Sequence, residues 1–157
     1  ERKLVTPAPF DRFIAGDLTA LNEAQLTGFN TFVDSGCASC HNGVGAGGGM
    51  YQKLGLVKPF ATTDTGREEA THNEADKFFF KVPSLRNIEK TGPYFHDGKV
   101  ATLEDAIRLM AEHQLGRTLT DQQISEIRAF LSSLTGTLPT ELIAVPALPG
   151  VSPVSGT

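Results

Sequence analysis

The feature that most constrains this chain is the run Cys37-Ala38-Ser39-Cys40-His41. Two cysteines separated by two residues, with a histidine directly after the second, form the attachment signature of a c-type haem. The thiols add to the haem vinyl groups as thioethers, and the imidazole binds the iron from one face. A disulfide would leave the histidine unexplained, and a zinc site would need two further good ligands. The run therefore predicts one covalent haem c, around which the chain must fold.

Composition agrees with a single compact domain. The chain has 157 residues, of which 39% are hydrophobic and 20% charged, as is typical of a soluble domain with a core of its own. The net charge of −4 argues against nucleic acid as a partner. No apolar run is long enough to span a membrane, and the first residues lack a signal region, so we interpret the chain as mature or excised. Because haem is attached to such motifs outside the bacterial cytoplasm, we expect a periplasmic location.

A helix is predicted just before the haem motif. Asn22 and Gln25 have the spacing of a capping box, in which each side chain satisfies a backbone N–H at the helix start. Gly28 leaves room for the close approach of another helix. The apolar face is expected to consist of Leu26, Phe29 and Val33.

Two further helices are predicted after residue 100. The first has Thr102 at its start and Gly116 at its end, and the second begins at Thr120, paired with Gln123, and stops at Gly136 and Pro139. Their apolar faces comprise Leu103, Ile107 and Met110 in the first, and Ile124, Ile127, Leu131 and Leu134 in the second. We therefore predict an all-α, cytochrome c-like domain with long loops, in which the first and last helices cross at Gly28.

The predicted domain occupies residues 18–138, between an N-terminal arm (1–17) and an extended C-terminal tail (139–157). Pro7 and Pro9 interrupt regular pairing in the arm, while Phe10 and Phe13 anchor it on the core. The tail is rich in Pro, Gly, Ser and Val.

Three internal segments lack a helical pattern. The glycine-rich run 43–49 lacks the lysine and hydroxyl residue of a phosphate-binding loop, so we expect its backbone to pack against the haem edge. Residues 61–77 are polar without a clear period, which predicts a mobile surface loop. Residues 78–82, which precede Pro83, are expected to be extended, with three phenylalanines lining the haem pocket.

The second axial position of the iron decides the chemistry, because an open face binds small ligands and a thioether restricts the iron to electron transfer. Met50 follows His41 too closely to round the ring easily, whereas Met110 has ample chain before it. A methionine on an apolar helical stripe can equally be a core residue, so spacing alone leaves both roles open for Met110. Other candidates are His72, His96 and His113; the last also suits a helix end.

Several motifs resemble the bacterial dihaem cytochrome c peroxidases, in the order found in that family. They are Cys37-Ala-Ser-Cys-His-Asn-Gly43, Phe80-Lys-Val-Pro-Ser-Leu-Arg-Asn87, Gly92-Pro-Tyr-Phe-His-Asp-Gly98, Thr102-Leu-Glu-Asp-Ala106, Gln114-Leu-Gly116, Ala129-Phe-Leu131 and Leu134-Thr-Gly136. The resemblance covers nearly the whole chain but only the C-terminal half of such an enzyme. It implies the electron-transfer domain with its high-potential haem.

The resemblance also implies site residues. The second axial ligand of this haem is a methionine at the position of Met110. Main-chain carbonyls that match Thr91 and Pro93 contribute to an interdomain calcium ion. Related enzymes that mature a tryptophan-derived quinone have tyrosine as the ligand, whereas residue 110 is methionine, which favours the peroxidase branch. Candidate partners for the haem propionates, which could equally be solvated charges, are Arg67, Lys81 and Arg86.

The peroxidatic haem belongs to the N-terminal half of such enzymes, and the 2 cysteines here supply only one attachment motif. We therefore expect an electron-accepting domain that takes electrons from a small cytochrome c or cupredoxin and passes them to a peroxidatic haem domain, which reduces hydrogen peroxide. The resemblance also allows a homodimer. Two alternatives stay open: a stand-alone monohaem electron carrier, and an enzyme or sensor with an open iron face.

Overall fold

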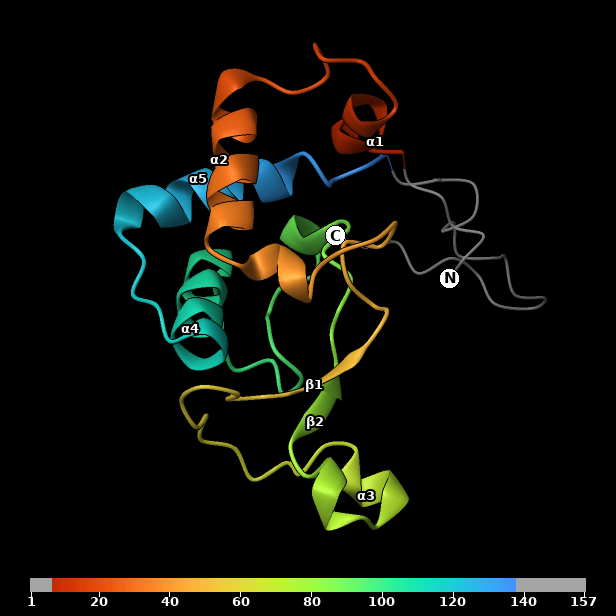
Figure 1. The fold of residues 1–157 in the computed structure, drawn as a ribbon, viewed down its shortest axis with the longest axis vertical. Helices are drawn as coiled ribbons and strands as arrows, with labels where there is room; N and C mark the ends of the chain where they lie inside the picture. The colour runs from red at the N-terminus through yellow and green to blue at the C-terminus, as the bar shows by residue number, and fades with distance from the viewer. Residues whose placement is uncertain (1–6, 138–157) are drawn as a thin grey trace, which may run out of the picture.

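The computed structural model describes residues 7–137, and in that range it is helical with one small sheet (Figure 1). The α-helices are α1 (Pro9–Ile14), α2 (Glu23–Asp34), α3 (Glu68–Thr71), α4 (Leu103–Leu115) and α5 (Asp121–Ser132). Short 3₁₀ turns are η1 (Cys37–Ser39), η2 (Glu74–Asp76) and η3 (Ile88–Lys90), and the strands are β1 (Tyr51–Lys53) and β2 (Phe79–Lys81). The predicted all-α class is confirmed, whereas the predicted tail over 139–157 lies outside the described residues.

Helices α2 and α5 cross in close contact, as Figure 1 shows. Asn22 caps α2 through a capping box with Gln25, as predicted. At the crossing, a β-carbon on Gly28 would lie 1.9 Å from the carbonyl oxygen of Glu126, so only glycine fits there. One detail of the predicted face was wrong: Val33 is 43% exposed, and Phe32, 5% exposed, occupies the core. The buried stripe of α2 therefore runs through Gly28 and Phe32.

The last two helices begin at the predicted caps. The Thr102 hydroxyl accepts a hydrogen bond from the Asp105 amide at the start of α4, and Thr120 forms a capping box with Gln123 at the start of α5. Helix α5 ends at Ser132, before the predicted stop at Gly136. Leu134 is nevertheless fully buried, because the turn that follows α5 folds it back into the core.

The N-terminal arm contains a helix, which the sequence analysis did not predict. Pro9 occupies the first turn of α1, where its missing N–H costs no hydrogen bond. The Phe10 ring lies 5.5 Å from that of Phe29 and 5.3 Å from that of Phe130, so the predicted anchoring of the arm is confirmed. Tertiary contacts of aromatic rings thus stabilise a helix too short to form alone.

The chain between α2 and α4 wraps around the lower half of the molecule in Figure 1. Strand β1 pairs antiparallel with β2, with Tyr51 opposite Lys81. Residues 61–77, expected to be an irregular loop, contain α3 and η2. Phe78 is left-handed, with φ 64°, rather than extended, because its amide turns to bond the carbonyl of Thr65. None of the helices within residues 7–137 combines the length and apolar character needed to cross a bilayer.

Candidate functional site

An apolar cavity of about 460 Å³ lies between η1, β2, α4 and α5. Its size is typical of sites that enclose a small molecule or cofactor. Apolar walls come from Phe32, Leu85, Ile107, Ile127 and Leu131. The cysteine, histidine and methionine side chains in its wall are Cys37, Cys40, His41, His96 and Met110. The cavity therefore brings together side chains from both ends of the domain.

The two cysteines and His41 sit side by side because η1 turns the chain directly after α2. The amides of both Cys40 and His41 bond to the Cys37 carbonyl, at 3.3 and 3.0 Å. The cysteines are free thiols, not a disulfide. Burial raises the pKa of Cys37 to about 11, so its free thiol is neutral at physiological pH. Both sulfur atoms are thus placed for attachment to a group that fills the cavity.

The His41 imidazole is held neutral by its surroundings. Burial lowers its pKa below the usual range, and the nearby backbone carbonyls of Ala46 and Pro83 oppose that shift more weakly. Its Nδ1 atom is buried and has no hydrogen-bond partner of good geometry among the described residues. In the tautomer with its proton on Nδ1, a neutral imidazole keeps the lone pair of Nε2 free for a metal. The residue therefore suits coordination of an iron atom in the cavity.

Met110, on α4, lines the same cavity as the cysteine motif. Met50 is 40% exposed and lies outside the cavity wall in the described part of the chain. His72 is exposed at the end of α3. His113 bonds the Lys58 carbonyl through Nδ1 at 3.0 Å and packs against Phe60, also away from the cavity. Of the sixth-ligand candidates, only Met110 and His96 remain.

His96 is already engaged by its neighbours. Its ring stacks on Phe80 at 4.3 Å, and its Nε2 atom lies 3.5 Å from the Asp64 carboxylate and 3.4 Å from the Thr62 hydroxyl. A nitrogen that faces a carboxylate is turned toward that partner rather than toward a metal. Met110, whose thioether has no such partner, is the better placed of the two.

Gln114 is a cavity residue whose role the sequence analysis missed. Its Oε1 accepts from the amides of Gly55 and Leu56, at 2.6 and 3.1 Å, and its Nε2 donates to the Lys53 carbonyl at 3.0 Å. One side chain thus holds residues 53–56 beside the Met110 wall. The signal that could have found it is its place in the Gln114-Leu-Gly116 motif, one turn beyond Met110.

The three basic residues considered as partners of the haem propionates do not gather at the cavity. Arg67 pairs with Asp76 at 3.3 Å, and Arg86 pairs with Asp11, so neither lines the cavity. Lys81 is exposed at the cavity rim and remains available to a carboxylate. Of these three residues, only Lys81 is therefore left as a partner for a haem propionate.

Thr91 and Pro93 both line the rim of the cavity. Their carbonyl oxygens accept no hydrogen bond from another group within residues 7–137. In the same range no three His, Cys, Asp or Glu side chains gather closely enough to bind a metal ion. A cation bound here would therefore depend on carbonyl oxygens, which suit calcium.

Two predictions about the cavity wall were wrong. The glycine run 43–49 does not line the cavity; it covers the opposite side of His41, where Gly47 meets Nδ1. Of the three consecutive phenylalanines only Phe80 lines the cavity.

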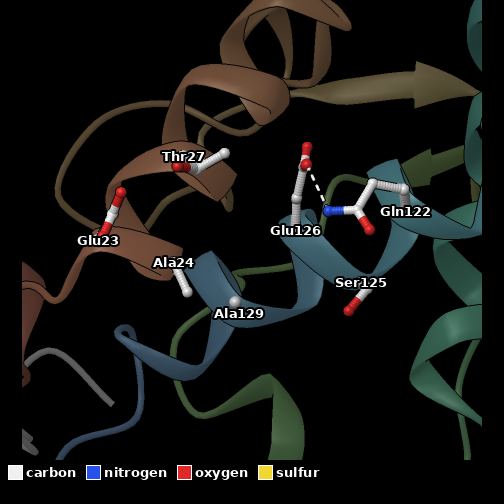
Figure 2. A pocket seen from close by; sticks show the side chains of 7 residues that line it. All are labelled: Glu23, Ala24, Thr27, Gln122, Ser125, Glu126 and Ala129. Atoms are coloured by element: carbon white, nitrogen blue, oxygen red, sulfur yellow. Dashed lines mark hydrogen bonds between the residues drawn. The ribbon is translucent and has the colours of Figure 1, made fainter.

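A second, shallower groove lies on the outer side of the α2–α5 crossing (Figure 2). It is lined by small side chains and by acidic or amide side chains, and on its α5 side Gln122 donates to Glu126 at 2.9 Å. It contains no cysteine, histidine or methionine. We therefore place the functional site in the apolar cavity.

Comparison with known proteins identifies the family of the chain. A model of the cytochrome c family matches residues 26–135. The chain is 51% identical over 142 residues to a cytochrome c551 peroxidase of Nitrosomonas europaea, and 43% identical over 155 residues to one of Pseudomonas aeruginosa. These matches cover 88% and 95% of this chain but only 42% and 44% of those proteins. The chain thus spans less than half the length of these relatives.

Among solved structures, a MauG-like protein associated with microbial copper homeostasis matches with a TM-score of 0.71 and 27% identity. The match covers 90% of this chain and 55% of that one. Family model and relatives agree on a cytochrome c domain related to cytochrome c peroxidases, and the structural match has the same kind of fold. The chain therefore belongs to the cytochrome c family, within the group that contains the bacterial cytochrome c peroxidases.

Proposed function

We propose that the cavity holds one haem c, attached through Cys37 and Cys40, with His41 and Met110 as the axial ligands of the iron. The observation that carries the proposal is that all four side chains line the same cavity. Bound there, the haem supplies a one-electron ferric–ferrous couple. A thioether ligand raises the potential of such a couple, which suits an acceptor of electrons.

The protein's own residues fit this cofactor. The His41 imidazole is kept neutral, as a ligand must be. Buried apolar residues such as Ile107 and Leu131 exclude water from the ring, and Lys81 at the rim offers a cation to a propionate. With both axial positions filled, peroxide has no open site on this iron.

We further propose that the chain is the electron-accepting part of a cytochrome c peroxidase. It would receive electrons from a small cytochrome c or cupredoxin in the periplasm and deliver them to an N-terminal domain with a peroxidatic haem. The relatives in Nitrosomonas europaea and Pseudomonas aeruginosa, both named cytochrome c551 peroxidases, support this role. The free carbonyls of Thr91 and Pro93 suit the interdomain calcium ion of that family.

The axial ligand is tested by replacing each methionine in the haem-loaded chain. Met110→Ala should abolish the weak absorption band of thioether-ligated ferric iron, lower the reduction potential and let carbon monoxide bind the ferrous form. Met50→Ala, at an exposed site, should leave all three unchanged. Loss of the band in Met50→Ala with its retention in Met110→Ala would show that the wrong methionine has been assigned.

The role in a peroxidase is tested by peroxide turnover. The isolated chain should reduce peroxide far more slowly than a complete dihaem enzyme, because no open coordination site with positioned acid–base groups is present in the described cavity. Turnover at a comparable rate would contradict the proposal.

Donor docking is expected near the cysteine motif. Val44, Met50 and Tyr51 are 87%, 40% and 51% exposed, and exposed apolar side chains suit transient redox complexes, whose interfaces are small. Val44→Glu should slow stopped-flow reduction by the donor without changing the haem spectrum. Glu126→Lys, on α5, serves as the distant charge control. Ala46, in the same glycine-rich run, is buried, so a substitution there would not test the surface.

A further inference from the structure

The side of His41 that faces away from the cavity is covered by the backbone of residues 44–47. A β-carbon on Gly47 would lie 3.1 Å from His41 Nδ1 and 2.1 Å from the carbonyl oxygen of Pro83. The glycine is therefore pressed between the imidazole and the segment that begins at Pro83. Movement of this loop must therefore change the contacts of the His41 imidazole.

Residues 84–86 hold that loop from the other side, by donating hydrogen bonds to three consecutive carbonyls of the loop. The Arg86 Nε atom donates to the Val44 carbonyl at 2.6 Å, the Ser84 hydroxyl to the Gly45 carbonyl at 2.5 Å, and the Leu85 amide to the Ala46 carbonyl at 3.1 Å. Three successive carbonyls of the loop are thus fixed immediately before Gly47.

Arg86 also connects this loop to α1. Its two terminal nitrogens donate to the two carboxylate oxygens of Asp11, at 2.9 and 2.6 Å, while Nε remains on Val44. The guanidinium group is planar, so its donors fix α1 and the loop in one geometry. Its side chain is only 20% exposed, which limits screening of the pair by solvent. Helix α1 is itself fixed to the core by Phe10.

We propose that Arg86 is a positioning residue, through which Asp11 of α1 sets the place of residues 44–47 and thereby the orientation of the His41 imidazole on the haem iron. The inference rests on the proposed haem ligation. It makes α1, which does not line the cavity, a determinant of the redox properties of the site.

The test compares Asp11→Asn with Asp17→Asn in the haem-loaded chain. Both substitutions remove one negative charge from the same end of the molecule, but Asp17 contacts Thr19 and Arg12 and does not reach the loop. The readouts are the reduction potential and the g-values of the ferric low-spin electron paramagnetic resonance spectrum, which respond to the orientation of the axial imidazole. Asp11→Asn should shift both the g-values and the potential. Asp17→Asn should shift each of them less.

Arg86→Lys is the second variant, because it keeps the charge but cannot bond Val44 and both Asp11 oxygens together. It should reproduce the spectral shift of Asp11→Asn. The proposal is overturned if Asp11→Asn matches Asp17→Asn, or if Arg86→Lys has the parent spectrum.

A glycine pair tests the contact with His41 itself. Gly47 and Gly48 both have positive φ, 123° and 81°, but a β-carbon on Gly48 meets nothing within 4 Å. Gly47→Ala should therefore shift the g-values, whereas Gly48→Ala should not; equal spectra would overturn the proposed route. Absence of covalent haem from the parent chain would instead overturn the proposed function, and the parent spectrum reveals it before any variant is compared.

Discussion

On the His41 side of the cavity, backbone groups bond to other backbone groups and to the side chains of Ser84 and Arg86, whereas on the Met110 side a loop is attached to the end of one helix. The pairing of β1 with β2 continues toward His41, since Val82 donates to the Met50 carbonyl and Gly48 to the Val82 carbonyl, each at 2.9 Å. On the other side, residues 53–58 are held by Gln114 and by the His113 carbonyl at the end of α4.

This difference teaches where each side is vulnerable. A backbone ladder tolerates changes of exposed side chains but leaves no room for added atoms where segments touch. A loop held mainly at one helix end, by the Gln114 side chain and the His113 carbonyl, tolerates added bulk but depends on those two anchors. Each side should therefore fail under a different kind of substitution.

The largest effect is expected at the α2–α5 crossing, where the backbones of the two helices touch. Gly28→Ala would place a β-carbon 1.9 Å from the Glu126 carbonyl oxygen, so the helices must move apart. We expect a loss of about 2 kcal/mol or more in the free energy of unfolding, measured in urea. Gly49→Ala, where an added β-carbon meets nothing within 4 Å, is the control. Equal stability of the two variants would show that the crossing is not tightly packed.

A smaller effect is expected on the Met110 side. Gln114→Leu removes an acceptor shared by two amides and a donor to Lys53, which should cost about 1–3 kcal/mol. Hydrogen exchange at the Gly55 amide should become faster, because the loop opens locally. Gln122→Leu, which loses only a surface bond to Glu126, should leave that exchange rate unchanged. Unaltered protection of Gly55 in the Gln114 variant would mean that the His113 carbonyl alone holds the loop.

The smallest effect is a pH dependence on the His41 side. The hydrogen bond from Arg86 is the main reason that the pKa of Asp11 lies below its usual value in the folded chain. A carboxyl group with a lowered pKa stabilises the fold above its unfolded pKa of about 3.9, and this contribution is lost as the pH falls through the folded value. The stability difference between the parent and Asp11→Asn should therefore be larger at pH 7 than at pH 3. A difference that stays constant between these pH values would show that the ion pair adds no stability.

Local signals in the sequence predicted the helix starts correctly, because a cap needs only the few residues around it. Asn22, Thr102 and Thr120 each cap the helix that their spacing indicated. The motif from Cys37 to His41 likewise contains its chemistry within five consecutive residues. Gly28 was also predicted at the helix crossing, since only a glycine explains such close approach.

Contacts between distant residues decided the rest. Helix α1 forms because Phe10 reaches Phe29 and Phe130, and Phe32 rather than Val33 faces the core because the crossing at Gly28 fixes the rotation of α2. Arg86, a candidate for a haem propionate by its charge, pairs instead with Asp11. A guanidinium group takes whichever carboxylate the fold brings near, and only the folded chain determines which one that is.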